Sequence, residues 1–189
     1  MKKTILAVLA MGALSCALFS QQAQADQIKG AILIGGRVIL DAPLGSATTV
    51  TTWFDVFQTP GLSSVLATSD DFSSVLLLSS ATMATPWVFN PSTPTPGLWS
   101  VGGFTFDLTS ATIVTQISNF LNVEATGVIH GIGFDDTPGT FQFTVTGSGV
   151  RLGFAALTTA VPTPDGGATV MLLGAALGAL GIARRFLKS

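Results

Sequence analysis

Hydrophobic and polar positions alternate through the middle of the chain. In residues 98–108, the apolar residues Phe104, Phe106 and Leu108 are separated by single polar residues, the period-two pattern of a strand that buries one face. No segment between residues 26 and 158 has a convincing helical periodicity. This region is therefore predicted to be all-β.

About eight to ten strands separated by turn residues are expected, which predicts an antiparallel β-sandwich or jelly-roll-like domain. Residues 75–78 form a short apolar run that a buried strand would explain. Residues 86–96 contain four prolines and are predicted to form a loop or an extended edge. The other expected strands are residues 28–34 and 37–40, joined at Gly35–Gly36, and residues 48–57, 98–108, 111–117, 120–132, 141–146 and 150–157.

The first 25 residues have the three-part layout of a secretory signal peptide. Two lysines precede an apolar stretch over residues 4–19, and Ala23 and Ala25 form a small-x-small cleavage site before Asp26. Signal peptidase is therefore an expected partner. Cys16 as a lipoprotein cysteine is the alternative, but the residues before it fit that pattern poorly. Because Cys16 is the only cysteine, its removal would leave a mature chain without a disulfide.

The chain ends in a segment of three parts. Proline, aspartate and glycine residues come first and cannot extend a helix from upstream. Residues 168–183 carry no charge, and as a helix they would span roughly 24 Å, close to the hydrocarbon core of about 30 Å. Arg184, Arg185 and Lys188 follow. Their positive charge predicts a single C-terminal transmembrane helix with the basic end in the cytoplasm and the ectodomain outside.

This tail resembles the PEP-CTERM class of bacterial sorting signals, in particular the variant with Val-Pro-Asp-Ser-Gly before its helix. The resemblance implies a Gram-negative, exopolysaccharide-producing bacterium and an exosortase that cleaves near the motif. It also implies transient anchoring in the inner membrane, followed by transfer to the cell surface or extracellular matrix. The motif residues are Val161, Pro162, Pro164, Asp165, Gly166 and Gly167, followed by the apolar run and the basic end.

Two departures from that variant leave the cleavage bond open. Gly166 stands where the variant usually has serine, and two residues interrupt the Val-Pro element before Asp165. An ordinary single-pass anchor and a buried core helix are the alternatives for this segment.

The signal peptide and the sorting tail leave a β-ectodomain between them, and the net charge of this middle region differs from that of the whole chain. Between Asp26 and Asp165, three basic residues stand against all ten acidic residues, a net charge of −7. Nucleic-acid binding needs a basic surface, so no nucleic-acid partner is expected. The regions are the signal peptide (1–25), the β-ectodomain (26–158) and the sorting tail (159–189), which comprises the linker and motif (159–167), the membrane helix (168–183) and the basic end (184–189).

Candidate chemistry in the ectodomain is sparse. His130 is the only histidine, and there is no nucleophile-elbow Gly-x-Ser-x-Gly, so a packing or surface role is favoured over catalysis. One histidine and no mature cysteine argue against a zinc site, and no glycine-rich loop matches a nucleotide-binding fingerprint. The pairs Asp70–Asp71 and Asp135–Asp136 lie in loop-like contexts that suit calcium, but turn-initiating aspartates are favoured.

The ectodomain is accordingly expected to be a non-catalytic structural protein of the surface or matrix, without cofactor or metal. One alternative is a carbohydrate-binding module with exopolysaccharide as its partner, in which exposed Trp53, Trp87 or Trp99 would stack on sugar rings. The second alternative is a secreted hydrolase, in which Asp107 and Glu124 would supply two carboxylates across a groove.

Overall fold

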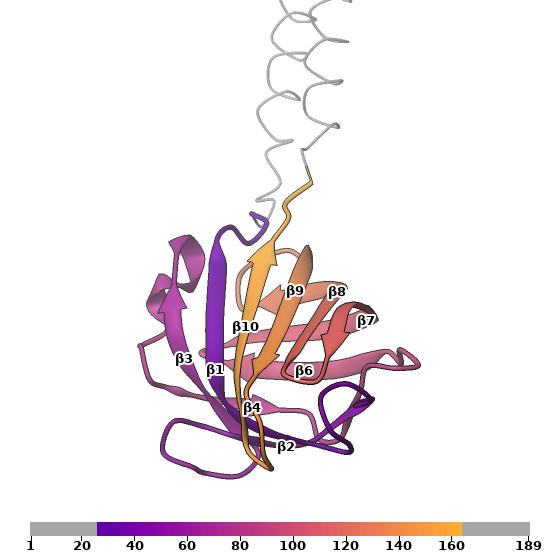
Figure 1. Ribbon diagram of the computed structural model, residues 1–189. Coiled ribbons are helices and arrows are strands. Elements are labelled where there is room, and N and C mark those ends of the chain that lie inside the picture. Colours follow the sequence, from indigo (N-terminus) through magenta and orange to yellow (C-terminus); the bar gives the residue numbers. More distant parts are fainter. Residues whose placement is uncertain (1–25, 164–189) are drawn as a thin grey trace, which may run out of the picture.

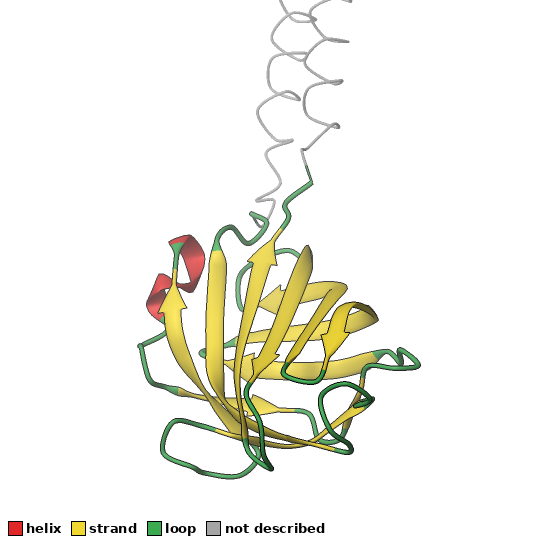
Figure 2. Cartoon of the chain, viewed as in Figure 1, coloured by secondary structure: helices red, strands yellow, loops and turns green. Residues whose placement is uncertain are grey.

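The computed structural model describes residues 26–163, and this part of the chain is built almost entirely from strands (Figures 1 and 2). One short 3-10 helix, η1 (Asp70–Ser74), interrupts them. The all-β prediction is thus confirmed, while the signal peptide and the expected transmembrane helix lie outside the described residues. The strands are β1 (Ala31–Leu40), β2 (Thr49–Phe54), β3 (Leu62–Thr68), β4 (Ser80–Met83), β5 (Trp87–Val88), β6 (Thr95–Val101), β7 (Phe104–Ile117), β8 (Phe120–Gly131), β9 (Thr137–Thr146) and β10 (Leu152–Ala160).

The strands form one closed barrel, not the two packed sheets that the sequence pattern predicted. The antiparallel pairs run in the order β10-β9-β8-β7-β6-β4-β3-β1, and β1 pairs with β10 to close an eight-stranded ring. In Figure 1, β1 and β10 lie side by side although they are the first and last strands. The ring and its core lie wholly within residues 26–163, so this part of the chain has what it needs to fold alone.

The two glycines lie inside the continuous strand β1, where the sequence pattern predicted a turn between two strands. The first half of β1 pairs with β3, and the second half pairs with β2. A Cβ atom on Gly36 would lie 2.1 Å from the carbonyl oxygen of Phe54, so only glycine permits this close approach. One strand therefore exchanges neighbours at Gly35–Gly36 instead of ending there.

Strand β2 crosses one end of the barrel (Figure 1), and the short strand β5 pairs with it. They carry Trp53 and Trp87, whose rings stack with centroids 6.0 Å apart inside the core. The Trp53 ring also meets Phe143 and Phe154 edge-on, at 5.5 Å and 5.0 Å. This aromatic cluster closes that end of the barrel.

Helix η1 fills the gap between β3 and the β6–β7 hairpin near the other end. Phe72 is fully buried there, 4.7 Å from the ring of Phe104 and 6.5 Å from the ring of Trp99. Val75 follows it into the core, but the next three leucines are exposed. The expectation of a buried strand at residues 75–78 was therefore wrong, because the chain turns outward after Val75.

Within residues 26–163, no helix is long and apolar enough to cross a membrane.

Candidate functional site

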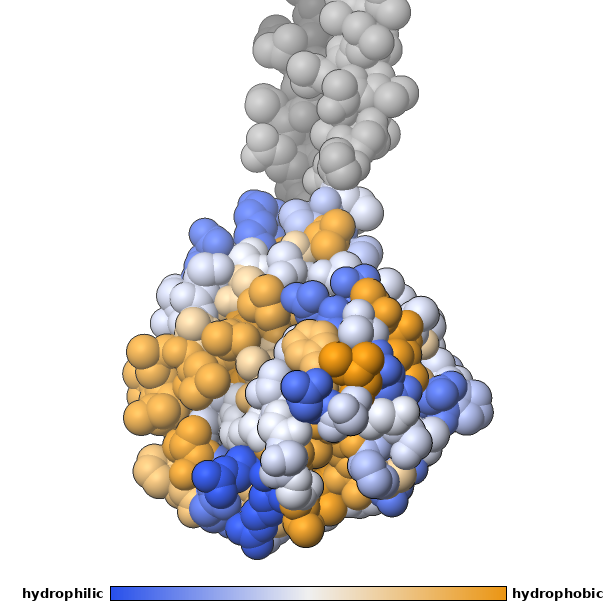
Figure 3. Space-filling model, in the orientation of Figure 1, coloured by the Kyte–Doolittle hydropathy of each residue, from blue (hydrophilic) through white to orange (hydrophobic). Residues whose placement is uncertain are grey.

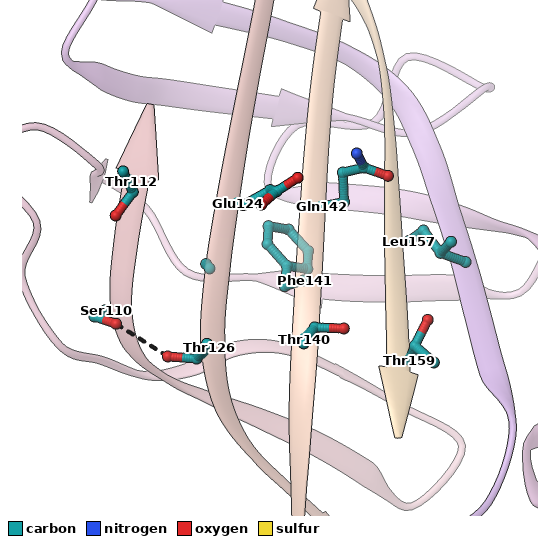
Figure 4. Close-up of a pocket in the computed structure, with 10 residues that line it drawn as sticks. Ser110, Thr112, Glu124, Thr126, Thr140, Phe141, Gln142, Leu157 and Thr159 are labelled. Atoms are coloured by element: carbon teal, nitrogen blue, oxygen red, sulfur yellow. Dashed lines mark hydrogen bonds between the residues drawn. The ribbon is translucent and has the colours of Figure 1, made fainter. Parts of the chain in front are cut away.

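A shallow groove lies on the outer face of strands β7 to β10 (Figure 4). Its volume is about 470 Å³. Every second residue of each strand faces outward. The register of the strands aligns these outward residues in two rows across the sheet. The rows are Ser110–Thr126–Thr140–Thr159 and Thr112–Glu124–Gln142–Leu157.

The side chains of this groove are mostly neutral hydrogen-bonding groups. The Ser110 and Thr126 hydroxyls are 3.0 Å apart, and the Gln142 amide and the Glu124 carboxylate occupy the second row. Leu157 supplies an apolar wall, whereas the neighbouring Phe141 is buried and faces the interior. Such a surface offers both donors and acceptors to a neutral polyhydroxylated ligand, and its one charged side chain disfavours anions.

His130 lies outside this groove, between two carboxylates. Its Nδ1 is 2.6 Å from Asp136 Oδ1, and its Nε2 is 3.3 Å from Asp107 Oδ2. The other oxygen of Asp107 accepts a hydrogen bond from the Gly97 amide at 2.7 Å. The histidine thus ties β8 to β7 and to the loop before β9. In the described part of the chain, no hydroxyl is hydrogen-bonded to His130.

The two carboxylates contact opposite ring nitrogens of His130, so the three side chains do not converge on one ion. Among the described residues, no group of three or more His, Cys, Asp or Glu side chains is placed to hold a metal ion. This arrangement is that of a surface histidine joining strands.

The paired aspartates lie at the start of η1 and in the loop before β9. Asp70 and Asp71 begin η1, and Asp71 Oδ2 accepts a hydrogen bond from the Lys29 amide at 2.7 Å. Asp136 contacts His130, while the Asp135 carbonyl accepts a hydrogen bond from the hydroxyl of Thr137 at 2.9 Å. The carboxylates of Asp71 and Asp136 thus connect each loop to a separate part of the chain.

The two carboxylates of the hydrolase alternative lie far apart. Asp107 is opposite Val128 in the register, and Glu124 is four positions further along β8, about 13 Å at the rise of a strand. Paired glycosidase carboxylates are separated by about 5–9.5 Å. The geometry therefore does not favour joint action of this pair.

All three tryptophans are fully buried, so none can stack on a sugar at the surface. The Trp53 indole donates to the Ala84 carbonyl at 2.9 Å, and the Trp99 indole donates to the Thr158 hydroxyl at 2.9 Å. The suggestion that they form a sugar platform was wrong. They fill the barrel, because the interior of an eight-stranded barrel is just wide enough to be packed by large side chains.

A carboxylate that the sequence did not single out organises the loop after β1. Asp41 Oδ1 accepts hydrogen bonds from the amides of Thr48 and Thr49 at 2.9 and 3.0 Å, and Oδ2 accepts from the Thr48 hydroxyl at 2.6 Å. Partial burial raises the pKa of Asp41, but these hydrogen bonds outweigh it and hold the pKa below its usual value. An aspartate shortly before a Pro-x-Gly turn was the available signal.

The two ends of the described chain meet at one end of the barrel (Figure 1). Gln27 Nε2 donates to Thr163 Oγ1 at 3.0 Å, and the Thr163 amide donates to Gln27 Oε1 at 2.7 Å. We call this pair the terminal clasp. Asp26 is paired with Lys29 at 2.7 Å, and this hydrogen bond and charge lower the pKa of Asp26 and raise that of Lys29.

The predicted processing residues fall on both sides of this clasp. Asp26, Val161 and Pro162 are exposed beside it. The remaining predicted positions lie outside the described residues: Ala23, Ala25, Pro164, Asp165, Gly166, Gly167, Arg184, Arg185 and Lys188.

Comparison of the chain with protein-family models, with curated proteins and with solved structures finds no match. The likeness of the tail to a sorting signal therefore rests on its own sequence motif.

Proposed function

We propose that this protein is an exported structural protein of the cell surface or extracellular matrix, delivered by an exosortase-type sorting tail. The observation that carries the proposal is the terminal clasp. It brings Asp26, the first residue after the expected signal-peptide cut, beside Thr163, the residue before Pro164. Both cleavage segments thus leave the barrel at one point, so both can be removed without disturbing a strand.

The packing of the barrel supports a non-catalytic role. Its interior is occupied by aromatic side chains, including the stacked pairs Trp53–Trp87 and Trp99–Phe106. Five polar residues are buried with them in the described part of the chain, and the other polar groups there hold turns and strands together or face solvent. A barrel with a packed interior of this kind suits a structural role at the cell surface.

The mass of the intact protein recovered from the cell surface tests the delivery proposal. A chain that begins at Asp26 and ends near Asp165 would support it, and a chain that still carries Arg184 and Arg185 would contradict it. Alanine at both arginines is expected to block processing, because the positive end sets the orientation of the tail. The matched control is Arg37→Ala on the exposed barrel surface, which should be processed normally.

The groove on β7 to β10 favours carbohydrate binding as a second candidate function. Its two rows of hydroxyl, amide and carboxylate groups suit the hydroxyls of a neutral exopolysaccharide. The variant Thr126→Val/Thr140→Val/Gln142→Leu should lose retention on immobilised neutral polysaccharide. Thr146→Val, an exposed residue of β9 outside the groove, is the control. Equal retention of both variants would exclude this groove as the binding site.

A further inference from the structure

The segment that leads into β9 holds the N-terminal end of the described chain. The Asp135 amide donates to the Asp26 carbonyl at 3.2 Å. The Ile28 amide donates to the hydroxyl of Thr137 at 2.8 Å, and this second contact is buried. We call residues 135–138 the anchor segment. The residues next to the expected signal-peptide cut are therefore fastened to the anchor segment.

The anchor segment also holds the C-terminal end of the described chain. The Val161 amide donates to the Pro138 carbonyl at 2.8 Å. Gln27 and Thr163, which form the terminal clasp, each lie within two residues of a contact with the anchor segment. Figure 3 shows hydrophilic residues beside the point where the two ends leave the barrel, so solvent reaches this region. Movement of the anchor segment would therefore loosen both halves of the clasp.

One histidine fastens the anchor segment to the wall of the barrel. His130 lies next to the end of β8, opposite Thr105 of β7. Its Nδ1 is 2.6 Å from Asp136 Oδ1 in the anchor segment, and its Nε2 is 3.3 Å from Asp107 Oδ2 on β7. The Asp107 carboxylate is also held by the Gly97 amide, at 2.7 Å. The side chain of Asp136 is 73% exposed, so Asp136 is the partner that can move away.

The charge of the ring decides whether both contacts are favourable. A neutral imidazole has a single N–H group, and its other nitrogen carries a lone pair. When the ring is neutral, one of the two carboxylates therefore faces a lone pair, and that contact is repulsive. The imidazolium has an N–H group on each nitrogen and attracts both carboxylates. Both contacts are thus favourable only while the ring is protonated, and imidazole ordinarily changes its charge between pH 5 and 8.

Acidic groups predominate on the elements around this ring. Strands β6 and β9 carry no charged residue. Lys29 is 2.7 Å from Asp26, so its charge is already paired. On the described elements around the ring, the loss of its proton therefore removes a positive charge from a region of carboxylates. The charged side chains there, besides His130, are Asp26 and Lys29 in the segment before β1, Asp107 on β7, Glu124 on β8, and Asp135 and Asp136 in the anchor segment.

We propose that His130 is a pH-responsive latch on the terminal clasp. While the ring is protonated, Asp136 is held against β7 and β8, and the anchor segment keeps both chain ends in place. As the pH rises through the range in which the imidazole titrates, the hold on Asp136 is lost and the two ends become more accessible to processing. The inference deepens the proposed function and rests on it only in treating the two ends as sites of cleavage.

Amide hydrogen exchange in residues 26–163 tests the latch. The amides of Ile28, Asp135 and Val161 report on the anchor segment, and the Gly61 amide, which is hydrogen-bonded between β2 and β3, is the reference. Loss of a partly exposed charged contact changes a local equilibrium by roughly two- to fivefold. Between pH 5 and about pH 7.5, the protection factors of the three amides should fall by this amount after correction for the intrinsic pH dependence of exchange. The protection of the Gly61 amide should stay constant.

The decisive variant is His130→Gln, because glutamine keeps a polar side chain that does not titrate. His130 is the only histidine in the chain, so this variant should lose the pH dependence. It retains the α-amino group at Asp26, which titrates near pH 8. Asp136→Asn should also lose most of the pH dependence. The matched control is Asp135→Asn, which removes a neighbouring exposed carboxylate that does not contact the ring and should leave the pH dependence intact.

The ring nitrogens give a direct check, because their NMR shifts report whether each carries a proton. At pH 5 both nitrogens of His130 should be protonated, and a ring with one proton there would overturn the proposal. It would also be overturned by protection of the three amides that does not change with pH. A pH dependence that survives in His130→Gln would overturn it in favour of the α-amino group. Failure of the delivery proposal is seen separately, as a mature mass that still includes Arg184 and Arg185, and would leave the exchange results unchanged.

Discussion

The role of η1 as part of the barrel core can be tested by truncating Phe72. This side chain is fully buried between the rings of Phe104 and Trp99. Truncation of a buried phenylalanine to alanine destabilises a protein by about 3–5 kcal/mol, since the transfer energy is lost and a cavity remains. We therefore expect Phe72→Ala to lower the free energy of unfolding by about 4 kcal/mol.

Urea denaturation of residues 26–163 measures this loss. With a denaturant dependence of about 2 kcal/mol per molar urea, the midpoint should fall by about 2 M. Phe57→Ala is the matched control, because the Phe57 side chain is 68% exposed and its removal should change the midpoint little. A loss below about 1 kcal/mol for Phe72→Ala would refute the reasoning, because cavity formation in a packed core exceeds that value. It would mean that η1 lies on the barrel without completing it.

Three further predictions concern other parts of the barrel. Gly36→Ala should destabilise the domain by several kcal/mol in urea denaturation, because its Cβ would lie 2.1 Å from a backbone oxygen of β2, whereas Gly153→Ala should be neutral. Asp41→Ala should lower stability by about 1 kcal/mol, the scale of a lost cap, because it removes the acceptor of the Thr48 and Thr49 amides. Because the pKa of Asp41 is lower in the folded protein, its ionised carboxylate stabilises the fold above the unfolded pKa of about 4. This stabilisation is lost as the pH falls through the folded pKa. In acid, the melting temperature of the variant should therefore depend less on pH than that of the unchanged protein. Thr158→Val should cost about 1–3 kcal/mol in the same urea assay, because it leaves the buried indole N–H of Trp99 without its acceptor; a neutral result would contradict this.

Local alternation of residue types was enough to predict most of the strands, because that pattern reports directly on which face is buried. It failed for β3, in which Ser63 and Ser64 are buried side by side and break the alternation. It also failed at residues 75–78, where four consecutive apolar residues suggested burial but the left-handed turn at Leu78 exposes three of them.

Closure of the barrel had no local signal. It depends on the pairing of Ala31 with Thr159, which lie at opposite ends of the domain sequence. The same reason hid the candidate groove. Thr126 and Thr140 become neighbours only through the register of β8 and β9, so neither attracted notice as a single residue. By contrast, the position of the paired aspartates at breaks between strands was visible in the sequence, because turn-forming residue types are a local signal.

Closure by the first and last strands would also set the order of folding events on the proposed export route. If the chain crosses the membrane with its N-terminus leading, β1 arrives early and keeps one edge without a partner until β10 has emerged. Pairing between such distant segments is slow to form, and an open edge invites aggregation or chaperone binding. Ala160, the last residue of β10, lies only a few residues before the apolar run that starts at residue 168. On the proposed export route, the domain would therefore complete its folding only as the tail reached the membrane, so that arrival of the proposed sorting signal and folding of the barrel would nearly coincide.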